Sequence, residues 1–185
     1  MISRYSVPSL MAAHTPLVFL LHGRASSPQS PKMQALHAVC LAKGLEDRIP
    51  DFSSTNDPHE RLARLKDLIR SETRPLIFAA SSMGGYVATR VSQETPIEGL
   101  FLIAPALYRP TYSINGYAPK ARAISIIHGW NDDIVPIEES IRFAKSFGGK
   151  LYAISGDHYL DDQLSEIQRA FAHFLDDITS TQAIS

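Results

Sequence analysis

Short, mainly apolar runs alternate along the chain with longer segments in which apolar residues recur every three or four positions. The apolar runs are 17–21, 76–80, 99–104, 123–128 and 150–154, with a weaker one at 47–52. The segments with helical spacing are 31–43, 59–71, 83–94, 137–147 and 160–178. Apolar strands separated by helices predict an α/β fold, a doubly wound, mostly parallel sheet of about six strands in a three-layer sandwich. Because Pro50 cannot donate a backbone hydrogen bond, we expect 47–52 near an edge.

Size and charge narrow the class of protein. The 185 residues contain no repeat or linker, so we expect a single domain over 1–185, with 1–15 as a loose arm or short edge strand. A formal net charge of −1 argues against nucleic acid and anionic membranes as partners. No apolar run is long enough to cross a bilayer, and no signal peptide is expected. The single cysteine, Cys40, favours a buried thiol and a cytoplasmic location.

The segment Ala80–Gly85, Ala-Ser-Ser-Met-Gly-Gly, directly follows an apolar strand and opens a helical pattern. A nucleophilic serine on such a strand-to-helix turn needs small residues two positions before and after it. Ser82 has Ala80 and Gly84 there, whereas Ser81 would have the bulky Met83. The sequence therefore favours Ser82 as the nucleophile, although Ala80 replaces the first glycine of the usual G-x-S-x-G pattern. The alternative is a serine that only caps the helix.

A nucleophilic serine needs a base, normally a histidine oriented by a carboxylate. His158 lies between the last strand and the last helix, at the end of a parallel sheet where reactive groups gather. Asp132 follows the preceding strand and is the favoured carboxylate; Asp133 is expected to cap the helix that begins near Ile137, and Asp157 is the weaker candidate. The remaining histidines are interpreted as arm, turn, core or surface residues: His14, His22, His37, His59, His128 and His173.

Acyl transfer also requires two fixed donors for the developing oxyanion. The backbone N–H of Met83, directly after the proposed nucleophile, is one candidate. The backbone N–H of Arg24, after the turn that Gly23 permits, is the second. The Arg24 side chain is expected to face solvent, with steering of an anionic substrate as the alternative. No metal site is expected, because the sequence contains no spaced cluster of His, Asp and Glu.

The order Ser82, Asp132, His158 after successive strands resembles that of the α/β-hydrolase superfamily. More narrowly, the chain is similar to small bacterial esterase-like proteins of the YqiA type, over roughly 16–178 and through three segments: Leu21–Pro28, Ser81–Tyr86 and Gly156–His158. The resemblance implies no cofactor. Superfamily members often carry a lid after the strand that follows the helix next to the nucleophile. In this chain that interval, 104–122, is too short for a lid of several helices. Tyr108 and Tyr112 in this segment are candidates for substrate contact, with ordinary packing as the alternative.

Together these features predict a serine hydrolase that cleaves small carboxylic esters or thioesters through an acyl-enzyme on Ser82. The expected partner is a small-molecule substrate, and the oligomeric state stays open. The main alternative is a hydrolase-fold binding protein without catalysis. A flavodoxin-like nucleotide binder is disfavoured, because the chain lacks a glycine-rich phosphate loop.

Overall fold

The computed structural model of the protein describes residues 15–112 and 116–182, so the arm or edge strand expected over 1–15 lies almost wholly outside the described residues. Six strands are present in the described part: β1 (Leu17–Leu21), β2 (Asp47–Arg48), β3 (Leu76–Ser81), β4 (Ile97–Ile103), β5 (Ala121–Gly129) and β6 (Lys150–Ile154). The helices are α1 (Pro31–Ala42), α2 (Pro58–Ile69), α3 (Met83–Ser92), α4 (Ile137–Phe147) and α5 (Leu164–Gln182), with a 3₁₀ turn, η2, at Asp161–Gln163. Within the described part of the chain, no helix is long and apolar enough to cross a membrane.

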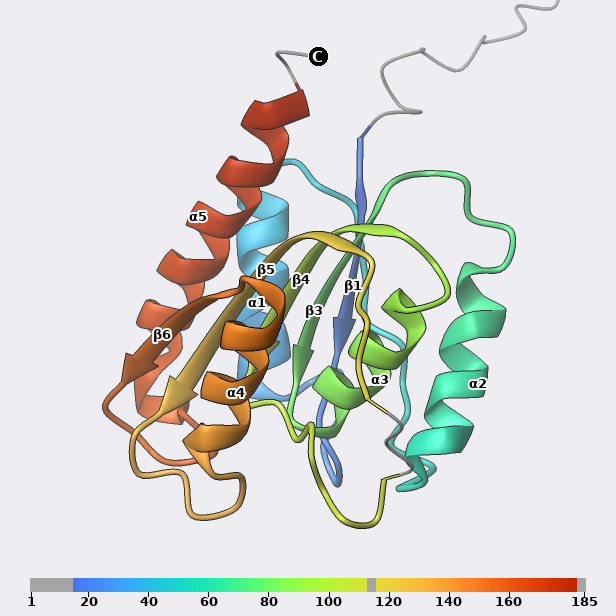
Figure 1. Cartoon of the computed structure of the whole chain (residues 1–185). Coiled ribbons are helices and arrows are strands. Elements are labelled where there is room, and N and C mark those ends of the chain that lie inside the picture. The colour runs from blue at the N-terminus through green and yellow to red at the C-terminus, as the bar shows by residue number, and fades with distance from the viewer. Residues whose placement is uncertain (1–14, 113–115, 183–185) are drawn as a thin grey trace, which may run out of the picture.

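The six strands form one parallel sheet in the order β2-β1-β3-β4-β5-β6. Helices α1 and α5 cover one face, and α2, α3 and α4 cover the other (Figure 1). This arrangement confirms the predicted doubly wound, three-layer α/β fold. Strand β2 lies at an edge as predicted but is only two residues long. Beyond it, the Phe52 N–H donates to the His22 ring, at 3.0 Å, instead of to a strand.

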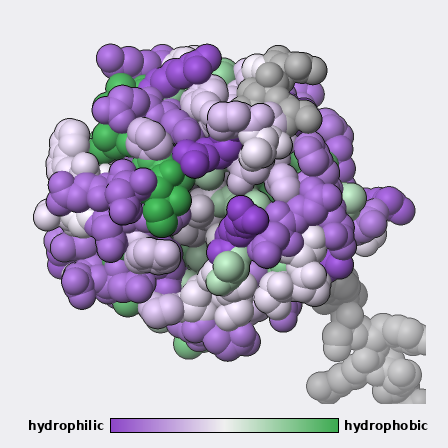
Figure 2. Space-filling view, turned by 90° about the horizontal axis from the view of Figure 1, so that it is seen from below, coloured by the Kyte–Doolittle hydropathy of each residue, from purple (hydrophilic) through white to green (hydrophobic). Residues whose placement is uncertain are grey.

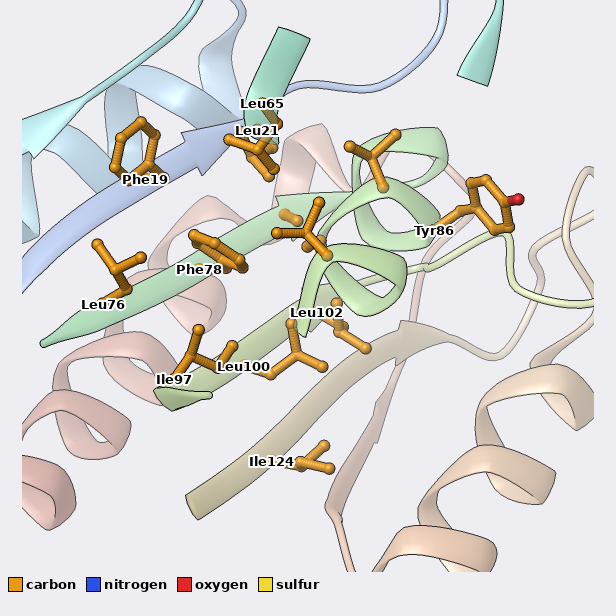
Figure 3. Packing of buried hydrophobic residues seen from close by; sticks show 14 of the residues in the cluster. Phe19, Leu21, Leu65, Leu76, Phe78, Tyr86, Ile97, Leu100, Leu102 and Ile124 are labelled. Carbon is orange, nitrogen blue, oxygen red and sulfur yellow. The ribbon is translucent and has the colours of Figure 1, made fainter. Parts of the chain in front are cut away.

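Two hydrophobic clusters fix the sheet between its helices. Because successive side chains of a strand point to opposite faces, Phe19 and Phe78 pack toward α2 and α3, whereas Val18 and Ile77 pack toward α1 and α5. Figure 3 shows the first cluster, in which Leu65 of α2 lies beside Leu21 of β1 and Tyr86 extends from α3. The central strands β1 and β3 are buried along their whole length. The loops at their carboxyl ends are therefore anchored to a rigid layer.

The last helix begins later than the sequence indicates. The prediction of a helix over 160–178 is wrong at its start, because α5 begins at Leu164 after the η2 turn. The Asp157 carboxylate accepts the N–H groups of Tyr159, at 2.9 Å, and Leu160, at 3.0 Å. Leu160 then adopts a left-handed conformation with a φ of 54°. This side-chain turn competes with helix formation and keeps His158, which lies within the turn, in a loop.

Candidate active site

Ser82 occupies the sharp turn between β3 and α3. Its backbone has a φ of 52° and a ψ of −118°, a combination that costs a non-glycine residue energy. Three backbone hydrogen bonds hold it there. Its N–H donates to the Ile103 carbonyl at 3.0 Å, and its carbonyl accepts from Gly85, at 2.9 Å, and Ala106, at 3.1 Å. The side chain thus leaves the sheet at a position that its surroundings enforce.

The residues around this turn are small because neighbouring atoms leave no room for larger side chains. A Cβ added to Gly84 would lie 2.4 Å from the carbonyl oxygen of Leu21, so α3 can approach β1 only with glycine there. Gly23 packs on the serine itself, because a Cβ at Gly23 would lie 3.2 Å from the Ser82 Cβ. Ala80, in place of the usual glycine, is fully buried in β3, and the turn keeps the conformation described above.

The structure brings Ser82, His158 and Asp132 into one hydrogen-bonded row. The Nε2 atom of His158 lies 3.0 Å from the Ser82 Oγ, and its Nδ1 atom lies 2.7 Å from Oδ2 of Asp132. A carboxylate can only accept, so Nδ1 carries the ring proton and donates it to Asp132. Nε2 is then left to accept the hydrogen bond of the Ser82 hydroxyl. The neutral imidazole is in the tautomer that general-base catalysis requires.

Asp132 is the most heavily hydrogen-bonded group of the site. Its Oδ2 atom accepts from His158 and also from Nε2 of His128, at 3.0 Å. Its Oδ1 atom accepts the backbone N–H groups of Ile134, at 3.0 Å, and Val135, at 2.8 Å. Burial alone would raise the pKa of this carboxyl, but the hydrogen bonds from His128, His158 and Val135 outweigh burial and hold its pKa well below the usual range. Asp132 therefore stays ionised.

His128, which the sequence analysis interpreted as a turn residue, bonds the Asp132 carboxylate. It is fully buried at the end of β5. Its Nε2–H is shared between Asp132 and the Val135 carbonyl, at 3.0 Å, and its Nδ1 lies 2.7 Å from the Ser140 Oγ, whose hydroxyl donates to it. The spacing of four residues between His128 and Asp132 was the signal available in the sequence.

The prediction that Asp133 caps the following helix is wrong. Helix α4 has Pro136 at its N-cap and no side-chain cap bond. The backbone N–H groups ahead of that helix bond Asp132 instead, and Asp133 is exposed.

The two candidate oxyanion donors flank the serine. Met83 begins α3, so its N–H belongs to the first turn, whose donors have no partner within the helix. Arg24 follows Gly23, the residue packed on Ser82. Among the described residues, no hydrogen bond is donated by the Arg24 N–H. Both groups are thus available to a ligand beside the serine.

A cavity of about 220 Å³ opens next to Ser82 and His158. Residues that line it include Arg24, Ser26, Ser30, Lys32, Met33 and Tyr159. The Nζ atom of Lys32 donates to the Tyr159 carbonyl at 2.6 Å, which ties α1 to the loop that carries His158. Figure 2 looks onto this carboxyl end of the sheet, where hydrophilic residues predominate and hydrophobic ones form small separate patches.

Neither Tyr108 nor Tyr112 lines this cavity. The Tyr108 ring lies under the guanidinium of Arg142, with 4.1 Å between the guanidinium carbon and the ring centroid. Tyr112 stacks on Tyr86, with ring centroids 4.3 Å apart. These contacts favour ordinary packing for both tyrosines.

Two further expectations concern the single cysteine and metal binding. Cys40 is buried, as predicted. Within 15–112 and 116–182, no group of three or more His, Cys, Asp or Glu side chains is arranged to hold a metal ion.

Solved structures with the same architecture define the class of protein. A candidate hydrolase of the alpha/beta superfamily from Xanthomonas campestris pv. campestris is 32% identical, with a TM-score of 0.77 over 87% of this chain and 98% of that one. A second Xanthomonas campestris protein, a member of the α/β serine hydrolases without a lid, is 17% identical, with a TM-score of 0.75 over 92% of this chain and 85% of that one. Est1E from Butyrivibrio proteoclasticus is also 17% identical, with a TM-score of 0.74 over 91% and 90%. The chain is an α/β hydrolase by fold.

The particular family follows from the sequence. The uncharacterised protein family UPF0227 matches residues 17–124, and the chain belongs to this family, which confirms the resemblance to the YqiA type. The matched residues include the Gly23–Arg24 turn and the Ser82 turn but end before Asp132 and His158. No curated protein matches the chain.

Proposed function

We propose that the protein is a serine hydrolase that cleaves small carboxylic esters or thioesters through an acyl-enzyme on Ser82. The observation that carries the proposal is the continuous row from the Ser82 hydroxyl through His158 to an ionised, buried Asp132. Its tautomer leaves Nε2 free to take the serine proton. The hydrolase assignments of structures with the same fold support the general class.

The reaction follows from the order of these groups. Nε2 of His158 takes the hydroxyl proton as Ser82 Oγ attacks the substrate carbonyl, and the N–H groups of Arg24 and Met83 receive the oxyanion. His158 then gives its proton to the leaving alcohol or thiol, which leaves an acyl group on Ser82. Water, deprotonated by the same imidazole, attacks the acyl carbon; the bond from that carbon to Ser82 Oγ then breaks, the imidazolium returns the proton to Oγ, and the acid leaves. Asp132 stabilises the imidazolium that forms in both halves of the reaction.

The size of the cavity supports a small substrate. Its volume of about 220 Å³ lies below the roughly 300–1,000 Å³ of pockets that bind drug-sized ligands. The segment between β4 and β5 contains no helix among its described residues, so no helical lid covers the serine from this segment. A small cavity without such a lid favours short acyl chains over lipid-like ones.

Labelling with a fluorophosphonate probe, together with turnover of p-nitrophenyl esters and thioesters of graded chain length, tests the proposal. The wild-type protein is expected to be labelled and to prefer short chains, and Ser82→Ala is expected to lose both labelling and turnover. Ser81→Ala removes the other serine of the motif and is expected to stay labelled. A wild-type protein that resists the probe and cleaves none of the esters would point to a hydrolase-fold binding protein instead.

A further inference from the structure

One buried cation lies behind the candidate oxyanion loop without an ion-pair partner. Arg61, in the first turn of α2, is fully buried. Its Nε donates to the Thr55 carbonyl at 2.9 Å, and its Nη1 donates to the carbonyls of His22, at 3.2 Å, and Gly23, at 3.0 Å. Among the described residues, no carboxylate lies within 4.0 Å of the guanidinium, and its Nη2 has no hydrogen-bond partner.

This placement is costly on three counts. A buried charge without a counter-ion loses its hydration and recovers no ion-pair attraction. A cation in the first turn of a helix also opposes the helix dipole. The unbonded Nη2 adds the cost of a buried donor that is not satisfied. These costs are offset only by hydrogen bonds to three loop carbonyls and by the Phe52 ring, whose centroid lies 5.9 Å from the guanidinium carbon, so the contacts of Arg61 with the loop need a reason.

The reason lies in the peptide between Gly23 and Arg24. In a trans peptide the C=O and the N–H point in opposite directions, and no cis peptide occurs in the described chain. The Gly23 oxygen accepts from Arg61 and also from Nδ1–H of His22, at 2.9 Å. Holding this oxygen toward Arg61 therefore directs the Arg24 N–H away from Arg61. Arg24 lines the cavity that Ser82 and His158 share.

Such a restraint is needed because of Gly23 itself. Close packing on Ser82 leaves little room for a side chain at Gly23, and glycine lowers the cost of rotating the peptide that follows it. A rotation of that peptide would replace the N–H donor by a carbonyl oxygen and repel an oxyanion. His22 alone restrains the peptide from within the same loop, whereas Arg61 joins it to α2. Burial lowers the pKa of His22, which favours the neutral ring that this arrangement uses.

We propose that Arg61 is a positioning residue for the oxyanion hole, because its guanidinium holds the Gly23–Arg24 peptide with the N–H toward the substrate. The role rests on the proposed function of Ser82 as the nucleophile. Arg61 touches neither the substrate nor the reacting atoms; it acts through the backbone of Arg24. The competing explanation is that Arg61 only ties α2 to the end of β1 and supports the fold.

The test compares Arg61→Met, Arg61→Lys and two controls, all assayed well below their unfolding temperatures. Arg64→Met removes an exposed arginine of the same helix, which bonds Glu60 and Ser54. Leu65→Ala removes buried packing of α2 and lowers stability without touching the Gly23 carbonyl. Measured for each are kcat and KM for a short ester, the rate of phosphonylation by the fluorophosphonate, the inhibition constant of a trifluoromethyl ketone, and the unfolding temperature.

Loss of one oxyanion donor lowers kcat by about 10²- to 10³-fold. Arg61→Met is expected to show this loss in kcat and in phosphonylation, with KM within about threefold and a matching loss of trifluoromethyl ketone affinity. Arg61→Lys is expected to recover about tenfold of the kcat loss but to stay below wild type, because an ammonium keeps the charge but can reach only one carbonyl. Arg64→Met and Leu65→Ala are expected to keep the wild-type kcat.

Three results would overturn the role of Arg61 while the wild-type protein is still labelled. They are phosphonylation of Arg61→Met at the wild-type rate, a change in KM alone, and an equal fall of kcat in a Leu65→Ala variant of the same stability. If Arg61→Met does not fold, Arg61→Lys decides, since a lower kcat with unchanged KM supports the role and wild-type kinetics refute it. A wild-type protein that is not labelled would instead overturn the proposed function itself.

Discussion

Replacement of Asp132 by asparagine removes one charge and reverses one set of hydrogen bonds with almost no change in volume. All four neighbours of this carboxylate donate to it: two imidazoles to Oδ2 and the N–H groups of Ile134 and Val135 to Oδ1. An asparagine offers one acceptor oxygen and one NH₂ group. Its NH₂ group must therefore lie opposite groups that are themselves hydrogen-bond donors. The backbone N–H groups cannot change, whereas the imidazoles can exchange tautomers.

The amide oxygen is therefore expected to stay with the backbone, and the NH₂ group faces the rings. Nδ1 of His158 must then accept, which moves the ring proton to Nε2, where it points at the Ser82 Oγ, 3.0 Å away. A protonated Nε2 cannot take the hydroxyl proton. A histidine in the wrong tautomer lowers kcat by about 10⁴-fold in a comparable triad. At about 1.36 kcal/mol per tenfold, the loss corresponds to roughly 5 kcal/mol of transition-state stabilisation.

The assay is kcat/KM for a short p-nitrophenyl ester at neutral pH, with far-ultraviolet circular dichroism to confirm folding. Asp133→Asn is the matched control, because it makes the same change one residue along the chain at an exposed position. It is expected to remain within about twofold of wild type in kcat/KM, since Asp133 is exposed and His158 bonds Asp132 instead. A folded Asp132→Asn variant within tenfold of wild type would refute the assignment of Asp132 as the residue that orients His158.

Three further predictions concern the turn that holds Ser82, the reactivity of the Cys40 thiol and the stability of the protein at low pH. Gly84→Ala is expected to cost about 3 kcal/mol or more in unfolding free energy by urea titration, because its Cβ would meet a backbone oxygen at 2.4 Å; Gly148→Ala, left-handed with a φ of 68° but in open space, is expected to cost only about 1–2 kcal/mol, and an equal cost would contradict this account of the turn. Burial raises the pKa of the Cys40 thiol to about 12, so iodoacetamide at pH 8 is expected to alkylate the unfolded but not the folded protein, as followed by intact mass. The lowered pKa of Asp132 means that the unfolded chain binds more protons below about pH 4, so stability falls as pH falls; Asp132→Asn is expected to lose less stability than wild type between pH 5 and pH 3, and equal losses would contradict the lowered pKa.

Much of the fold could be predicted because local patterns of apolar and polar residues determine most of its strands and helices. The apolar run 17–21 and the helical spacing of 137–147 match β1 and α4 residue for residue. The start of α5 could not be predicted from periodicity, since the Asp157 side chain captures the N–H groups of Tyr159 and Leu160. The length of β2 likewise depends on its pairing with β1, and the residues of β2 alone do not determine that pairing.

The candidate site was predictable only where chain order reflects the topology. Ser82, Asp132 and His158 each follow a strand of a parallel sheet, so their loops had to share one edge. His128 carried only its spacing of four residues from Asp132, and Arg61 carried no signal of this kind. The first looks like a turn residue, and the second bonds a carbonyl 38 residues away, a contact that no local pattern announces.

The central claim is that Ser82 forms an ester with the acyl group of the substrate. Acid quenching during turnover of a short p-nitrophenyl ester, followed by intact-mass and peptide mass spectrometry, detects that bond directly. The account predicts an increase equal to one acyl group, confined to the peptide that contains Ser82 and absent from Ser82→Ala. Turnover that continues in Ser82→Ala, or an acyl group carried by another residue, would contradict it.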